Sequence, residues 1–259
     1  KPDWKYVKKL SQELDPHIPL AEREQAREQV LQDQGSAEAH LAQKDAKGDV
    51  MLKRAEQLAE MKDYEQSSAI LLETLPSLQS AQEMDLYFDA LVLLGNNMIA
   101  EGRDAEVAQV GVQLKAAAEE RGVGNYYLPG MAEYFIGRGL FAQGPQFFAE
   151  GFEHLKEAAR QLGTENYFLG VGRVQEFMGI IYLEKLKKPL ETVTWWVRAK
   201  KSYSQSQTTS STYHKYYETD NYVAGLIRDL DDQIADLYRK LTPAQMSEVR
   251  KLKEQLGLE

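Results

Sequence analysis

The sequence has no cysteine, and this absence removes several kinds of chemistry at once. Without a thiol there is no disulfide framework, no cysteine nucleophile, no iron–sulfur cluster and no thiolate zinc site. The sequence also has no apolar run approaching the ~18 residues that would cross a bilayer. We therefore expect a soluble chain without a transmembrane segment.

Sequence motifs for catalysis or cofactor binding are also missing. The Gly-x-Gly pairs at Gly122, Gly137 and Gly170 do not continue into a nucleotide-binding pattern, and no Gly-Lys-Ser/Thr, Gly-x-Ser-x-Gly or His-Glu-x-x-His occurs. One helix face carries Glu150, His154 and Glu157. A cluster of surface salt bridges is a simpler interpretation of this face than a metal site. We expect no enzyme activity, no metal and no cofactor.

Charge is unevenly distributed along the 259 residues, whose formal net charge is −9. Residues 61–130 hold 4 basic and 11 acidic residues, whereas residues 184–217 hold 7 basic and 2 acidic ones. The acidic total disfavours nucleic acid as a partner. The local excess of positive charge marks the late segment as a distinct surface.

Apolar residues recur at helical spacing almost throughout, and no long stretch alternates as a β-strand would. Gly and Pro residues predict a turn between helices about every 20 residues, for example at Pro76, Gly102 and Pro189. Thr242-Pro243-Ala244-Gln245 combines an N-cap, a Pro at the first helical position and Gln at N3. The pattern predicts an all-α chain whose last helix runs from Pro243 to about Leu256.

An internal repeat of about 41 residues indicates how the helices are arranged. Asn125-Tyr126-Tyr127-Leu128 recurs 41 positions later as Asn166-Tyr167-Phe168-Leu169. Small residues recur at 41 or 42 positions, at Ala117, Ala158 and Ala199 and at Gly95, Gly137 and Gly179. Small residues at fixed points allow two helices to approach closely, so we expect stacked antiparallel helical hairpins. The alternative is chance similarity among helices rich in Ala and Gly.

Parts of the chain resemble tetratricopeptide repeats and the related Sel-type repeats found in bacteria. Met61 to Ala69 resembles the turn and second-helix opening of such a unit, and Met178 to Tyr182 followed by Trp195 to Lys200 resembles another. The period is longer than the usual 34 residues. The resemblance covers residues 49–259 and implies an α-solenoid: a right-handed superhelix whose concave face binds a peptide or protein.

Composition divides the chain into three regions. Residues 1–48 are polar and predict a helical arm or cap. Residues 49–241 form the helical-repeat domain, with a Ser/Thr/Gln-rich insertion at about 202–215, and residues 242–259 form a capping helix at the C-terminus. Such insertions usually form loops, often on the binding face.

The insertion and its flanks are the predicted partner-binding site, because Trp, Tyr and Arg dominate binding hot spots. The candidate residues are Trp195, Trp196, Arg198, Lys200, Lys201, Tyr203, Tyr213, Tyr216 and Tyr217. Adjacent helix positions point about 100° apart, so one of the two tryptophans must lie in the core. In the alternative interpretation, the aromatic side chains fill the last hairpin interface and the insertion is a linker.

The expected function is that of a protein-binding scaffold or adaptor. A dedicated neutralising partner of a toxin or secreted enzyme, and a peptide-sensing regulator, are the alternatives. Asn125, Asn166 and Asn221 are expected to act as helix N-caps, or else to contact a ligand. The sequence begins at Lys1, which leaves open a cytoplasmic location or, if a signal peptide preceded it, a periplasmic one.

Overall fold

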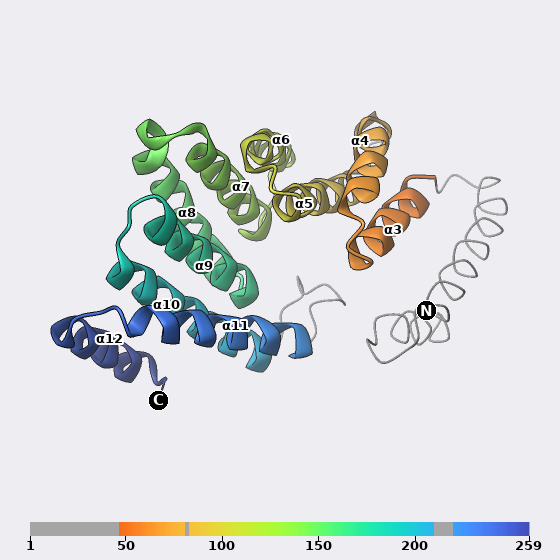
Figure 1. The fold of residues 1–259 in the computed structure, drawn as a ribbon. Helices are drawn as coiled ribbons and strands as arrows, with labels where there is room; N and C mark the ends of the chain where they lie inside the picture. The colour runs from red at the N-terminus through yellow and green to blue at the C-terminus, as the bar shows by residue number, and fades with distance from the viewer. Residues whose placement is uncertain (1–46, 81–82, 210–219, 259) are drawn as a thin grey trace. The chain divides into compact units, whose positions relative to one another are not determined.

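Helices make up nearly all of the computed structural model, which describes residues 47–80, 83–209 and 220–258 (Figure 1). No strand occurs in these three ranges, and the predicted all-α class is confirmed. The chain divides into two compact units, one ending at Asn97 and the other beginning at Met98. The predicted N-terminal arm or cap is residues 1–48, and of these only residues 47 and 48 are among the described residues. The other predicted domain limits stay predictions.

The helices follow one another with short connections. The first unit contains α3 (Lys47–Glu60), α4 (Tyr64–Ser80) and most of α5 (Met84–Ala100). The second unit contains α6 (Asp104–Arg121), α7 (Tyr127–Gln143), the short 3-10 helix η1 (Pro145–Phe147), α8 (Phe148–Thr164), α9 (Phe168–Glu184), α10 (Pro189–Thr208), α11 (Asp220–Tyr238) and α12 (Pro243–Leu256).

A buried serine joins the three helices of the first unit. The Ser67 hydroxyl on α4 donates to the Ala55 carbonyl on α3 at 2.6 Å. The same oxygen accepts a hydrogen bond from the Asn97 amide on α5 at 2.7 Å. All three residues are buried, so these bonds are made away from competing water.

Pro76 does not form the turn that the sequence predicts. It lies inside α4, which continues to Ser80. Proline removes one backbone donor and strains the preceding turn. Leu75 and Leu78 on either side of it are buried, and burial of apolar side chains supplies most of the stability of helices in proteins.

The second unit is a series of helices in which each packs against the next. α6 packs on α7, α7 on α8, α8 on α9, α9 on α10 and α10 on α11, and α12 returns to pack on α10. This succession is the stacking that the repeat predicts, and Figure 1 shows it as a run of neighbouring coils. The handedness of a superhelix stays a prediction.

Glycines set the distance between α7 and α8. A side-chain carbon added at Gly130 would lie 2.8 Å from Leu162, and one at Gly137 would lie 2.9 Å from Leu155. Both spacings are too short for carbon atoms in contact, so a larger residue at either position would force the leucine or the helix to shift. The predicted role of Gly137 as a point of close helix approach is confirmed.

The next hairpin repeats the arrangement with aromatic partners. A side-chain carbon at Gly172 on α9 would overlap the ring of Tyr203 on α10, and one at Gly179 would overlap Trp196. These glycines follow those of α7 by 42 residues, and their partners follow Leu162 and Leu155 by 41. The two hairpins are therefore structural repeats, as the sequence predicts.

The Asn-Tyr positions differ from the prediction. The N-caps of α7 and α9 are Tyr126 and Tyr167, so neither preceding asparagine caps a helix. Asn125 accepts a hydrogen bond from the Tyr127 backbone at 3.1 Å, and Asn166 adopts the left-handed conformation at φ 56°. Asparagine is among the few residues other than glycine that tolerate this conformation, which explains its place in the turn before α9.

The last helix begins and ends as predicted. The Thr242 side chain accepts from the Gln245 backbone at 3.3 Å, and the Gln245 side chain accepts from the Thr242 backbone at 2.9 Å. This reciprocal pair is a capping box, with Pro243 at the first helical position. Gly257 closes the helix in the left-handed conformation.

Candidate partner-binding surface

One face of α10 is built into the core. Trp196 is 2% exposed and Tyr203 is fully buried. The Trp196 indole donates to the backbone carbonyl of Glu176 on α9 at 3.2 Å, and the Tyr203 hydroxyl donates to the Glu176 carboxylate at 2.5 Å. Both polar atoms of these large side chains are therefore satisfied inside the protein.

Burial also changes how Glu176 and Tyr203 titrate. Burial raises the pKa of Glu176, although the Tyr203 hydrogen bond and the nearby Arg173 and Arg138 oppose the shift. Burial, reinforced by the Glu176 charge, raises the pKa of Tyr203 well above its ordinary value. Tyr203 consequently keeps its proton and remains a hydrogen-bond donor to Glu176 throughout the physiological range.

Two of the predicted contact residues are therefore structural. Trp196 and Tyr203 hold α10 against α9 and have no surface to offer a partner, which corrects their assignment as contacts. Their burial follows from the glycines opposite, which leave room for rings between the helices. The prediction that one of the adjacent tryptophans lies in the core is confirmed, with Trp196 as the buried one.

The opposite face of α10 carries Trp195, Arg198 and Lys201, which we call the α10 surface. Trp195 and Lys201 are half-buried and Arg198 is exposed. The Arg198 guanidinium carbon lies 4.9 Å from the centroid of the Trp195 ring, within the range of a cation–π interaction. The structure thus brings together these three predicted residues, which lie one helical turn apart.

Lys200 has a different role. Its ammonium group contacts both carboxylate oxygens of Asp231 on α11, at 2.6 and 2.7 Å. The pair joins α10 to α11 and neutralises the lysine charge. Lys200 is therefore a link within the second unit, and its predicted role as a partner contact stays a prediction.

The Ser/Thr/Gln-rich segment is partly helical. α10 continues to Thr208, whereas the composition predicts an inserted loop from about residue 202. The Ser202 hydroxyl donates to the Gln175 side chain at 2.8 Å, and the Ser206 hydroxyl donates to the Tyr203 carbonyl at 2.7 Å. With these bonds, small polar residues can be buried against α9. The predicted contacts Tyr213, Tyr216 and Tyr217 lie outside the described residues.

The repeat relates the α10 surface to the same positions on α8. Residues 155, 158 and 162 of α8 correspond to 196, 199 and 203 of α10 at a spacing of 41, and all six are buried. On the outer face, Glu157 and Arg160 correspond to Arg198 and Lys201. Equivalent positions therefore carry an ion pair on α8 and two cations on α10.

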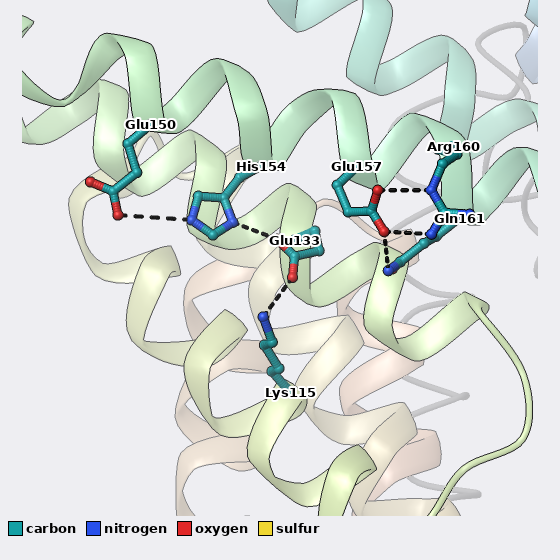
Figure 2. A network of polar contacts seen from close by, with 7 residues as sticks. All are labelled: Lys115, Glu133, Glu150, His154, Glu157, Arg160 and Gln161. Atoms are coloured by element: carbon teal, nitrogen blue, oxygen red, sulfur yellow. Dashed lines mark hydrogen bonds and ion pairs between the residues drawn. The ribbon is translucent and has the colours of Figure 1, made fainter.

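A second polar cluster joins α6, α7 and α8 (Figure 2). Glu133 on α7, with only 8% of its side chain exposed, accepts a hydrogen bond from Lys115 on α6 at 2.8 Å and contacts Nδ1 of His154 on α8. Nε2 of the same histidine lies 4.0 Å from Glu150. The hydrogen bond to Glu133 raises the pKa of Lys115. A buried carboxylate is thus balanced by groups from two neighbouring helices.

The sequence predicts only part of this cluster. Glu150, His154 and Glu157 are expected on one salt-bridge face, and Glu157 does pair there with Arg160 at 2.5 Å and accepts a hydrogen bond from Gln161 at 2.7 Å. The sequence pattern does not indicate Glu133 or Lys115. The signal available was Glu133 itself, the one carboxylate in the largely apolar segment 127–143.

The described part of the chain offers no cluster of three or more His, Asp and Glu side chains arranged to hold a metal ion. Within the same residues, no helix has the length and apolar character required to cross a bilayer.

Comparisons with protein-family models, with curated proteins and with solved structures find no match to this chain. The fold itself defines the class: an all-helical protein whose consecutive helices pack as helical repeats do.

Proposed function

We propose that this chain is a non-catalytic scaffold of the tetratricopeptide-like kind that binds a protein or peptide through the α10 surface. The observation that carries the proposal is the Trp195–Arg198 pair, in which an arginine lies over a tryptophan ring on the outer face of a helix. Tryptophan and arginine are the residues most enriched in binding hot spots.

The support beneath this pair favours the same function. α10 is fixed to α9 by Trp196 and Tyr203 and to α11 by Lys200. A surface on a helix fixed from two sides loses little conformational freedom when a partner binds. The α10 surface therefore has the preorganisation that tight binding requires.

Affinity capture from the native cell extract tests the proposal. The immobilised full-length chain is compared with W195A and R198A, each checked for an unchanged melting temperature. The matched control is V112A, which removes an exposed apolar side chain from α6. Proteins retained by wild type and V112A but lost with W195A and R198A support the proposal, and equal retention by all four contradicts it.

The capture also separates two kinds of binder. Several partners of moderate affinity are expected of an adaptor. A single partner of nanomolar affinity favours the dedicated neutralising role instead.

A further inference from the structure

Resting on the proposed function, we infer that the partner of the α10 surface is an acidic protein segment, in which two carboxylates meet Arg198 and Lys201 and an adjacent apolar side chain packs on Trp195. The starting point is a difference between two structural repeats. At the positions that α10 fills with Arg198 and Lys201, α8 has Glu157 and Arg160.

The two charged residues at these positions of α8 pair with each other. Glu157 accepts two hydrogen bonds from Arg160, at 2.8 and 2.5 Å, so neither of these two side chains requires a partner from another molecule. On α10 both positions are cationic, and like charges three or four residues apart destabilise a helix. In the described ranges, neither Arg198 nor Lys201 pairs with a carboxylate.

Two acidic residues of α10 and α11 already have cationic partners. Asp231 is paired with Lys200, and Glu191 lies 3.7 Å from Lys188 at the start of α10. At these two positions α10 thus carries like charges where α8 carries an ion pair, and the described residues supply no carboxylate to balance them. Unbalanced like charges of this kind are expected at functional sites. Carboxylates supplied by a partner would provide the missing compensation.

The geometry fits a short segment of protein. Arg198 and Lys201 are three residues apart, about 4.5 Å along the helix axis, a spacing that neighbouring carboxylates on one face of a peptide can match. Trp195 lies one turn before Arg198 and is half-buried, so it offers an apolar contact beside the charged one. Tryptophan provides such contact area at low entropic cost.

The charge of the whole chain favours a short acidic segment over an extended polyanion. The net charge is −9. An extended nucleic acid or an anionic membrane is repelled by this overall negative charge. A short peptide meets only the cations within the screening length of about 8 Å at physiological salt.

The test uses fluorescence anisotropy of a labelled peptide that contains two Glu residues beside a Leu, titrated with the full-length protein. The decisive variant is R198E, which gives α10 the arrangement of Glu and cation that α8 already has. It should therefore fold with an unchanged or higher melting temperature while losing about tenfold or more in peptide affinity. K201E should weaken binding similarly.

K156E is the matched control, because it makes the same charge change on an exposed position of α8. It should leave peptide affinity within about twofold of wild type once ionic strength is fixed. A peptide with Gln in place of Glu should bind at least tenfold more weakly.

Two results of these binding measurements would overturn the inference. One is an affinity for the acidic peptide that R198E and K201E leave unchanged, including the case of no measurable binding. The other is tighter binding of a single-stranded oligonucleotide of equal charge, or of phosphatidylserine vesicles, that R198E abolishes. A captured partner that W195A releases but R198E retains would refute the acidic segment alone, leaving the scaffold function in place.

Discussion

Gly172 on α9 lies directly against the ring of Tyr203 on α10, and two helical turns away Gly179 lies against Trp196 in the same way. The helices run antiparallel, so a spacing of seven residues on one matches seven on the other. Each of these two aromatic side chains of α10 fills the space beside a glycine of α9, which has no side chain. This complementarity brings the two backbones close and determines which face of α10 turns outward.

Replacing either glycine by alanine should therefore destabilise the protein. In G172A and G179A the new methyl group overlaps an aromatic ring that is itself buried, and we expect each to lower the free energy of unfolding by about 1–3 kcal/mol. G225A is the control, because no atom lies within 4 Å of a side-chain carbon built at that position of α11. It should be neutral or stabilise by up to about 1 kcal/mol. Urea denaturation of the three variants checks this, and equal effects would contradict the packing described.

The adjacent tryptophans should respond differently to truncation. W196A empties a buried site and removes a hydrogen bond to α9, so we expect a loss of about 3–5 kcal/mol in stability. W195A removes a half-buried ring and should cost about 1 kcal/mol or less. Thermal unfolding followed by far-UV circular dichroism distinguishes them. A larger loss for W195A would mean that the two faces of α10 are exchanged.

The sequence predicts the helices and the repeat well, because both depend on periodic patterns of small and apolar residues. The glycines at 137 and 179 are recognisable from their spacing of 42 residues alone. The orientation of α10 is not predictable in the same way. Periodicity shows that Trp195 and Trp196 point in different directions, but the choice between them depends on Gly179 opposite, which belongs to another helix.

Glu133 should contribute to stability because it joins two neighbouring helices from a buried position. E133Q removes the charge that faces Lys115 and His154, and we expect a loss of about 1–2 kcal/mol. The loss is limited because 42% of the Lys115 side chain is exposed and can be solvated. Chemical denaturation at neutral pH measures it.

E153Q is the comparison for that experiment. It removes the acidic partner of Lys156, a pair with the same chemistry and a 2.6 Å contact but with both side chains mostly exposed. Exposed pairs contribute little, so its free energy of unfolding should barely change. If the two variants lose equal amounts, the buried position of Glu133 has no energetic consequence.

Glu60 at the end of α3 should make stability depend on pH. Burial, with a smaller contribution from Glu56, raises its pKa from 4.5 to about 7. Among the described residues none hydrogen-bonds its Oε1 atom. The folded state therefore holds this proton more tightly than the unfolded state. The resulting stability is fully present below pH 4.5 and is lost as pH rises through 7.

E60Q should remove this dependence. At pH 8 the variant should be more stable than wild type by about 1–2 kcal/mol, a value reduced for partial solvent screening. The difference should shrink toward zero as pH falls to 4.5. Thermal melts across this pH range provide the measurement, and a gain for E60Q that does not vary with pH would contradict the assignment.

The polar parts of the molecule are the hardest to predict from sequence. Composition favours a loop from Ser202 onward, yet the serine hydroxyls of α10 find partners on α9 and on their own helix. Glu133 is similar, because its burial is tolerated only through groups that lie 18 and 21 residues away in the sequence. Patterns along a chain do not reveal which distant polar groups will meet.

The different environments of the two adjacent tryptophans have an optical consequence. Trp195 emits from beside a guanidinium at the surface, whereas Trp196 emits from the core. Iodide, an anionic quencher, should accumulate near Arg198 and quench the fluorescence of Trp195 preferentially, whereas the cation caesium should be repelled. In a variant with Trp4 replaced by Phe, the ratio of the iodide to the caesium quenching constant would measure the local electrostatic potential at α10. A carboxylate that binds there would lower this ratio, so binding could be followed without an added label.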